Sequence, residues 1–290
     1  MSRVRVRWAV WGAAVTAGVA AVALVPSWLE RRLTFFPTRE MSMTPENLGL
    51  SAETLRIPTA DGERIAAWLV PAARPLGTLL YLHGNGGSMS DRLTEVAALR
   101  LAGFSVMIFD YRGYGQSTGT PSETGIYRDT RAAWDFLVNQ RSVPPDRIVL
   151  LGESLGSAAA LDLSVAIRRD GKAPPGAAVL VGAFTSAAEM GRLHFPWLPV
   201  RWMLRERLDN LAAVRETDVP LLIIHGGRDA VAPAAMGRRL YEASASPLKD
   251  LLELPEAGHA TMMIGGRPVI EKIVSFVRRA WAAHAESSLP

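Results

Sequence analysis

Residues 147–156 read Arg-Ile-Val-Leu-Leu-Gly-Glu-Ser-Leu-Gly, and this stretch decides the fold. The apolar run 148–151 predicts a buried strand, and the small residues 157–160 predict a helix directly after it. Between them, the pattern Gly152-Glu153-Ser154-Leu155-Gly156 predicts a sharp, strained turn that holds the Ser154 hydroxyl above the sheet. We expect a side chain at either glycine to collide with a neighbouring strand or helix. The alternative is an ordinary turn that contains glycine and serine.

Two later segments carry possible partners for this serine. A serine hydroxyl becomes a nucleophile when a base takes its proton and an acid orients that base. Asp229 follows a strand expected at 219–225, and His259 follows a strand expected at 250–254. Because open α/β sheets build their sites at the carboxyl ends of strands, we predict Ser154 as nucleophile, His259 as base and Asp229 as orienting acid. Taken singly, Asp229 would be a turn or cap residue and His259 a surface residue.

An oxyanion hole is predicted from a glycine-rich loop. The strand expected at 78–82 is followed by His83-Gly84-Asn85-Gly86-Gly87, where the main chain can approach a substrate closely. We predict that the backbone N–H groups of Asn85 and Leu155 stabilise the oxyanion. A glycine-rich turn without a ligand is the alternative. A phosphate site is disfavoured because the loop has neither a Lys-Ser/Thr ending nor a G-x-G-x-x-G pattern.

Over about residues 30–280, the chain resembles the membrane-anchored alpha/beta-hydrolases, in the serine hydrolase group that includes depalmitoylases and lysophospholipid lipases. The matching segments are 33–38, 81–87, 109–117, 152–156, 224–229 and 258–259. Two positions depart from the usual pattern. Asp229 is followed by Ala-Val-Ala-Pro where relatives usually keep a Val-Pro pair, and His259 is followed by Ala-Thr where Asn or Asp is common. The resemblance implies the alpha/beta-hydrolase fold and a Ser154–His259–Asp229 triad.

Hydropathy along residues 30–290 predicts one α/β domain, with a mostly parallel central sheet flanked by helices and opened by two antiparallel strands. The remaining strands are expected at 53–57, 64–70, 104–109 and 177–182, and helices at 91–102, 123–140, 155–169, 234–243 and 268–283. Residues 36–49 are expected to form an irregular linker. Asp110 and Arg112 are expected to form an ion pair within a turn.

The stretch 184–210 interrupts this alternation and is rich in large apolar residues, among them Leu193, Phe195 and Trp197. In the family that the chain resembles, an insertion at this point often forms a lid over the site. We therefore expect a lid-like insertion that binds an acyl chain or docks on a membrane. The alternative is a helix packed on the sheet edge. Its arginines either meet lipid phosphates or form a solvated face.

Residues 8–28 contain no charged side chain and carry Trp8, Trp11 and Trp28 near their ends. This length and composition predict an N-terminal transmembrane or signal-anchor segment over residues 1–29. The short basic start favours a single-pass membrane protein with its amino end inside and its catalytic domain outside the cytoplasm. A cleaved signal peptide is the alternative.

The net charge of +4 comes from the N-terminal flank, because residues 1–40 hold six Arg and two Glu and the rest of the chain balances 26 basic against 26 acidic residues. The body therefore gives no charge argument for nucleic-acid binding. The chain has no cysteine, which excludes disulfides, thiol catalysis and Cys-based metal sites.

The predicted function is that of a serine hydrolase that cleaves a carboxylic ester or thioester through an acyl-enzyme. The apolar segments favour a small-molecule or lipid ester with an apolar acyl chain, and the chemistry requires no metal or cofactor. A serine aminopeptidase-like peptidase shares the elbow and the order of the triad, although such enzymes usually carry a large extra domain. A non-catalytic, membrane-tethered binding module is the other alternative. The sequence carries no signal for the oligomeric state.

Overall fold

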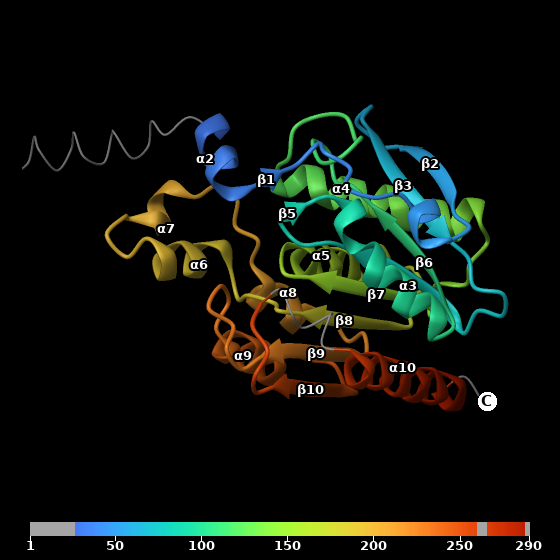
Figure 1. Cartoon of the computed structure of the whole chain (residues 1–290). Coiled ribbons are helices and arrows are strands. Elements are labelled where there is room, and N and C mark those ends of the chain that lie inside the picture. The colour runs from blue at the N-terminus through green and yellow to red at the C-terminus, as the bar shows by residue number, and fades with distance from the viewer. Residues whose placement is uncertain (1–26, 260–265, 288–290) are drawn as a thin grey trace, which may run out of the picture.

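An eight-stranded sheet forms the centre of the fold (Figure 1), with the strand order β10-β9-β8-β7-β4-β6-β3-β2. The computed structural model describes residues 27–259 and 266–287. The strands are β2 (Glu53–Pro58), β3 (Arg64–Val70), β4 (Gly77–Leu82), β6 (Phe104–Phe109), β7 (Ile148–Glu153), β8 (Ala177–Val181), β9 (Leu221–Gly226) and β10 (Lys249–Leu254). Strand β3 runs antiparallel to both β2 and β6, and all other neighbours are parallel. The mostly parallel sheet predicted from the sequence is thereby confirmed.

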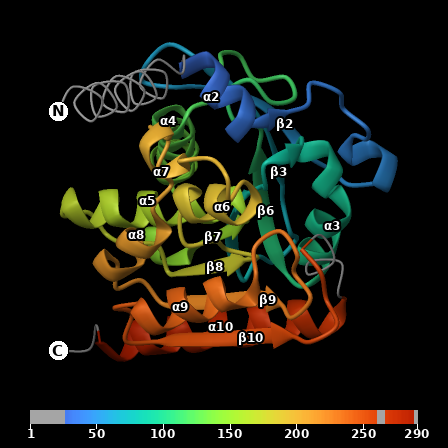
Figure 2. The same cartoon turned by 90° about the vertical axis from the view of Figure 1, so that its left-hand side faces the viewer.

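Helices cover both faces of this sheet (Figure 2). The helices α4 (Glu123–Asp135), α5 (Leu155–Arg169), α8 (Asn210–Glu216) and α9 (Ala234–Ala243) share one apolar core with the sheet. The helices α3 (Leu93–Leu101) and α10 (Arg267–Ser287) share the core on the opposite face. Successive residues of a strand point to opposite faces, so Leu80 lies in the first core and its neighbours Leu79 and Tyr81 in the second.

The central strands explain the long apolar runs of the sequence. All residues of β4, β6, β8 and β9 are buried, as expected for strands that are covered on both faces. Strand β4 pairs with β7, with Leu82 opposite Gly152. The loops that follow these two strands therefore leave the same edge of the sheet side by side.

The segment between residues 36 and 49 is more ordered than the sequence predicts. Helix α2 (Ser27–Thr34) leads into the short strand β1 (Phe36–Pro37), which pairs in parallel with β5 (Gly86–Gly87). A 3₁₀ helix follows at Pro45–Leu48. The expectation of an irregular linker was wrong for residues 36–37 and 45–48 but agrees with residues 38–44; β1 pairs with a strand about fifty residues later in the chain.

The predicted N-terminal membrane segment, residues 1–29, lies outside the described residues except for its last three. Within residues 27–259 and 266–287, no helix combines the length and the apolar character needed to cross a bilayer.

The insertion at 184–210 contains two short helices, α6 (Ala187–His194) and α7 (Val200–Met203). It is followed by α8, which the sequence analysis missed. None of the residues of α6 is buried.

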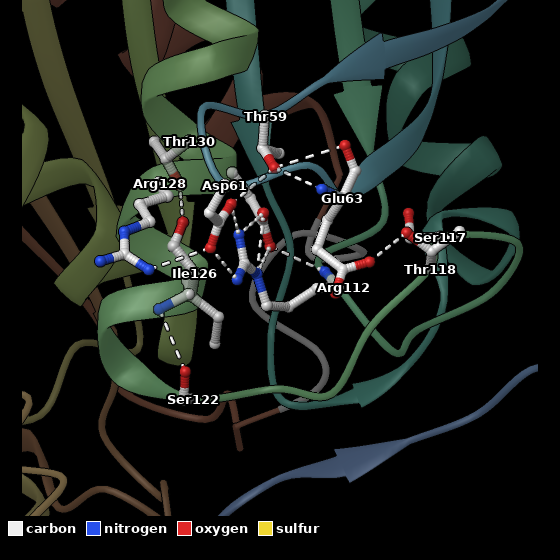
Figure 3. A network of polar contacts seen from close by, with 12 residues as sticks. Thr59, Asp61, Glu63, Arg112, Ser117, Thr118, Ser122, Ile126, Arg128 and Thr130 are labelled. Carbon is white, nitrogen blue, oxygen red and sulfur yellow. Dashed lines mark hydrogen bonds and ion pairs between the residues drawn. The ribbon is translucent and has the colours of Figure 1, made fainter.

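Arg112 joins the β2–β3 turn to helix α4 (Figure 3). Its guanidinium donates to both carboxylate oxygens of Asp61, at 2.8 and 3.0 Å, and to Asp129, at 2.8–3.1 Å. The expected Asp110–Arg112 pair is therefore wrong. Asp110 instead accepts the backbone N–H of Met89 at 2.6 Å, because the buried Arg112 side chain extends away from it toward α4.

We predict that Arg112→Met lowers the free energy of unfolding by about 3–5 kcal/mol, because it leaves the fully buried Asp129 without its cation. Urea unfolding at neutral pH, followed by tryptophan fluorescence, measures this loss. The matched control is Arg128→Met, which removes an exposed partner of Asp61 and should cost less than about 1 kcal/mol. Equal losses of unfolding free energy in the two variants would contradict a larger contribution from the buried Arg112–Asp129 pair.

Candidate active site

Ser154 occupies the turn between β7 and α5 with φ 50° and ψ −108°. This backbone conformation is rare for a residue with a Cβ and costs about 1–3 kcal/mol. The strained turn predicted from the sequence is thus present. The Ser154 N–H donates to the carbonyl oxygen of Val181 in β8 at 2.8 Å, and the Ser154 carbonyl accepts the N–H of Ser157 at 3.0 Å. The serine backbone is therefore fixed from both sides.

The two glycines of the motif are sterically required. A Cβ at Gly152 would lie 2.5 Å from the carbonyl oxygen of Gly156, and a Cβ at Gly156 would overlap the carbonyl oxygen of Leu82 in β4. This confirms the collisions expected from the sequence. Helix α5 consequently starts in direct contact with the sheet, and this close packing restricts the backbone conformation of the turn at Ser154.

Glu153, the residue before the serine, is held by contacts that the sequence analysis missed. Its carboxylate accepts Arg92 Nε at 2.7 Å and Arg92 Nη2 at 3.2 Å. The Tyr81 hydroxyl donates to the same carboxylate at 3.2 Å. These bonds tie the elbow to the 3₁₀ turn Met89–Arg92 and to β4. No local sequence pattern predicts that Arg92, 61 residues away, is the partner of Glu153.

Asp229 and His259 lie together at the ends of β9 and β10. The Nδ1–H of His259 donates to Asp229 Oδ2 at 2.7 Å, while Asp229 Oδ1 accepts the backbone N–H groups of Val231 and Ala232 at 2.9 and 2.8 Å. One carboxylate oxygen thus fixes the side chain and the other holds the imidazole. With its proton on Nδ1, a neutral His259 keeps the Nε2 lone pair available to accept a proton.

Several donors keep Asp229 ionised. Burial alone would raise the pKa of Asp229, but His225, whose Nε2 lies 3.5 Å from Oδ2, and the hydrogen bonds from His259 and the Ala232 N–H outweigh it and hold that pKa well below its usual range. His225 is itself fully buried, and its Nε2–H donates to the Ala232 carbonyl at 2.7 Å. A negative charge therefore stands beside His259 at neutral pH, where it stabilises an imidazolium.

The loops that carry Asn85, Ser154, Asp229 and His259 follow β4, β7, β9 and β10. These strands are parallel, so all four loops lie at one edge of the sheet. Within the described residues, His259 is hydrogen-bonded to Asp229 and not to Ser154. This conformation therefore has no hydrogen bond between Ser154 and His259. Such bonds are often long without substrate and tighten in the reacting complex.

The two predicted oxyanion donors begin or follow regular elements. Leu155 is the first residue of α5, where backbone N–H groups have no acceptor within the helix. The side chain of Asn85 is already engaged: Oδ1 accepts the Phe36 N–H at 3.1 Å and the Tyr114 hydroxyl at 2.8 Å, and Nδ2 donates to the Thr34 carbonyl at 2.7 Å. Asn85 therefore anchors its loop through its side chain.

Comparison with known proteins agrees with this architecture. The family model described as serine aminopeptidase, S33, matches residues 73–213. An uncharacterized protein of Mycobacterium tuberculosis is 37% identical over 269 residues, which cover 89% of this chain and 93% of the relative. An alpha/beta hydrolase domain-containing protein of Arabidopsis thaliana is 28% identical and covers 88% of both chains. An esterase of Pyrococcus furiosus superimposes with a TM-score of 0.70 at 21% identity, over 84% of this chain and 98% of the esterase.

We predict that Ser154→Gly is more stable than Ser154→Ala by about 1–2 kcal/mol. Both variants lose the hydroxyl, but only glycine adopts the observed φ without strain, a gain that exceeds its larger entropy in the unfolded chain. Urea unfolding of the two variants, side by side, gives the difference. An alanine variant as stable as the glycine variant would argue against stored strain at this turn.

Proposed function

The chain belongs to the alpha/beta-hydrolase family, and we propose that it is a serine hydrolase that cleaves carboxylic esters or thioesters. The observation that carries the proposal is the Asp229–His259 hydrogen bond at the sheet edge where Ser154 sits in its strained turn. A buried carboxylate that orients an imidazole, beside a serine on an elbow, is the arrangement that acyl transfer requires.

In the proposed first step, His259 Nε2 takes the proton from the Ser154 hydroxyl as Oγ attacks the substrate carbonyl carbon. The carbonyl oxygen becomes an oxyanion, which the N–H groups of Leu155 and Asn85 stabilise. Asp229 stabilises the imidazolium and keeps its orientation. The tetrahedral intermediate then collapses, the bond to the alcohol or thiol breaks, and His259 gives its proton to that leaving group.

In the second step, His259 takes a proton from water, and the resulting hydroxide attacks the acyl-enzyme carbonyl. The bond to Ser154 Oγ breaks, Oγ recovers the proton from His259, and the carboxylic acid leaves. The cycle requires Ser154 and His259 to come within hydrogen-bonding distance. Because the elbow is fixed by backbone contacts, we infer that this approach is made by His259 on the loop after β10.

Two other functions remain testable against this proposal. The description of the matching family model favours a serine aminopeptidase as the second candidate, since peptides and esters undergo the same acyl transfer. A non-catalytic binding module would keep the fold without an activated serine. Peptide and ester substrates in one assay separate the enzymes, and a serine-reactive probe separates both from a binding module.

We further propose a lipid-like or acylated substrate, and attachment to a membrane as a single-pass protein through residues 1–29 with the catalytic domain outside the cytoplasm. The support is the uncharged sequence 8–28 with its basic start. The exposed apolar side chains of the insertion, such as Phe195 and Trp197, support an acyl-chain substrate.

We predict that a fluorophosphonate probe labels the wild-type protein in detergent and fails to label Ser154→Ala, because only an activated hydroxyl attacks phosphorus at a useful rate. Hydrolysis of ester substrates should disappear in the same variant. The matched control is Ser275→Ala on the exposed face of α10, which should be labelled like the wild type. Full labelling of folded Ser154→Ala would overturn the assignment of the nucleophile.

We also predict that Asp229→Asn lowers kcat by about 10³–10⁴-fold, because an amide no longer fixes the proton of His259 on Nδ1. The exposed Asp218→Asn serves as control and should keep kcat. The lowered native pKa of Asp229 also predicts that the stability of the protein depends on pH.

A carboxyl whose pKa is lowered on folding contributes stability above its unfolded pKa of about 4, and this contribution is lost as the pH falls below that value. The stability difference between wild type and Asp229→Asn should therefore shrink on acidification. A difference that is constant down to acid pH would mean that Asp229 carries no special charge interaction.

A further inference from the structure

Most of the large apolar side chains that stay exposed gather at one end of the molecule. In the described part of the chain, the exposed large apolar side chains are Trp28, Leu29, Leu33, Phe36, Leu48, Leu101, Leu193, Phe195, Trp197 and Val231. The first four belong to α2 and β1, and Leu193, Phe195 and Trp197 belong to the insertion. These seven side chains are called the apolar face below. Trp197 is the most exposed of them, at 75%.

Buried polar contacts join the two halves of the apolar face. The carboxylate of Glu30 in α2 is buried and accepts the backbone N–H groups of Arg205 and Glu206 at 2.5 and 2.9 Å. Arg31 Nε donates to the Glu206 carboxylate at 3.2 Å. Helix α2 and the insertion lie at the same end of the structure in Figures 1 and 2. The two segments, about 175 residues apart, therefore form a single surface.

The charges around the apolar face are positive. Its acidic residues Glu30 and Glu206 are buried and already matched by backbone N–H groups and by Arg31. Among the described residues, the exposed side chains of Arg32 and Arg205 form no ion pair, and Arg192 has only a longer-range electrostatic interaction with Glu189, which is itself paired with Arg239. A surface of exposed Trp, Phe and Leu, with exposed guanidinium groups that form no close ion pair, matches the headgroup zone of an anionic bilayer.

The sequence that precedes α2 also favours a lipid bilayer as the partner of the apolar face. The uncharged run 8–28 ends at Trp28, which is itself part of the apolar face and 61% exposed. Tryptophan at the end of an apolar run is typical of the bilayer interface. A lipid-inserted N-terminal run would thus place the apolar face at headgroup level.

The insertion also lies against the candidate active site. His194 Nε2 is 2.9 Å from the carbonyl oxygen of Val231, two residues after Asp229. The strand before the insertion, β8, supplies the Val181 carbonyl that accepts the Ser154 N–H.

We propose that the apolar face rests on the headgroup region of an anionic lipid bilayer, next to the sheet edge that carries Ser154. Contact with the bilayer does not depend on catalysis. That this contact lets an acyl chain pass from the bilayer to Ser154 rests on the proposed function.

The absence of cysteine from the chain permits a direct test. Trp197→Cys places a single thiol on the apolar face, and Leu101→Cys places one at the exposed C-terminal end of α3, away from α2 and the insertion (Figure 1). Each full-length variant also carries Ser154→Ala, is labelled with the polarity-sensitive dye NBD, and is reconstituted into vesicles of phosphatidylcholine and phosphatidylglycerol.

We expect blue-shifted emission at position 197 and strong quenching by lipids that carry a headgroup-level spin label, whereas the dye at position 101 stays accessible to aqueous iodide. Equal iodide access at both positions would overturn the proposal. Because all samples lack Ser154, the result stands apart from any failure of the proposed hydrolase activity.

The arginines and a competing occupant are tested in the same system. Adding Arg192→Gln and Arg205→Gln should reduce lipid quenching at position 197 at least about twofold in anionic vesicles and leave it unchanged in pure phosphatidylcholine. An equal effect in both vesicle types would remove the charge argument for anionic lipid. If the emission at position 197 shifts to blue in detergent as protein concentration rises, a second copy covers the apolar face and the lipid proposal is wrong.

Discussion

The backbone conformation of Ser154 is the constraint on which the site depends. Its φ of 50° follows from the approach of α5 to β4 and β7, because any Cβ at Gly152 or Gly156 would enter a neighbouring carbonyl group. The strain of about 1–3 kcal/mol is sustained by the surrounding sheet. Strand β7 is paired on both sides, and its residues 148–152 are buried. The serine is therefore positioned by the least deformable part of the fold.

His259, the predicted base, follows a less buried strand than Ser154 and Asp229 do. Strand β10, which leads to His259, is at the edge of the sheet, and each of its six residues is only partly buried. Edge elements with few buried contacts open and adjust at lower free energy than central strands. The difference in burial between β7 and β10 implies different mobility at the two parts of the site. Ser154 is fixed by its backbone and Asp229 follows a buried strand, whereas His259 follows the more adaptable edge strand, which suits a contact proposed to form only in the reacting complex.

The sequence predicts this site unevenly. Most strands and helices of the sheet and its flanks are predicted, because continuous apolar runs and small-residue segments indicate burial on a local scale. The elbow is predicted because its glycines meet a local steric requirement, whereas β1 and α8 are not predicted. The sequence did not predict which residues pair through buried ion pairs and hydrogen bonds. Arg112 pairs with Asp61 and Asp129 rather than with Asp110, two residues away, because the direction of a buried side chain is set by what packs around it. The bonds of Glu153 and Asn85 reach 29–72 residues along the chain, beyond any local pattern.

Residues 27–37 connect two features that sequence analysis treats as separate. At one end, Glu30 accepts N–H groups of the insertion. At the other, Thr34 and Phe36 bond the Asn85 side chain, and β1 pairs with β5 in the same loop. The loop predicted to donate to the oxyanion and the insertion beside Asp229 are thus attached to one short segment. Because hydrogen bonds hold both ends, a displacement of α2 changes the geometry at Asn85 as well as at residues 205–206. The geometry of the Asn85 loop and the placement of α2 are in this way linked.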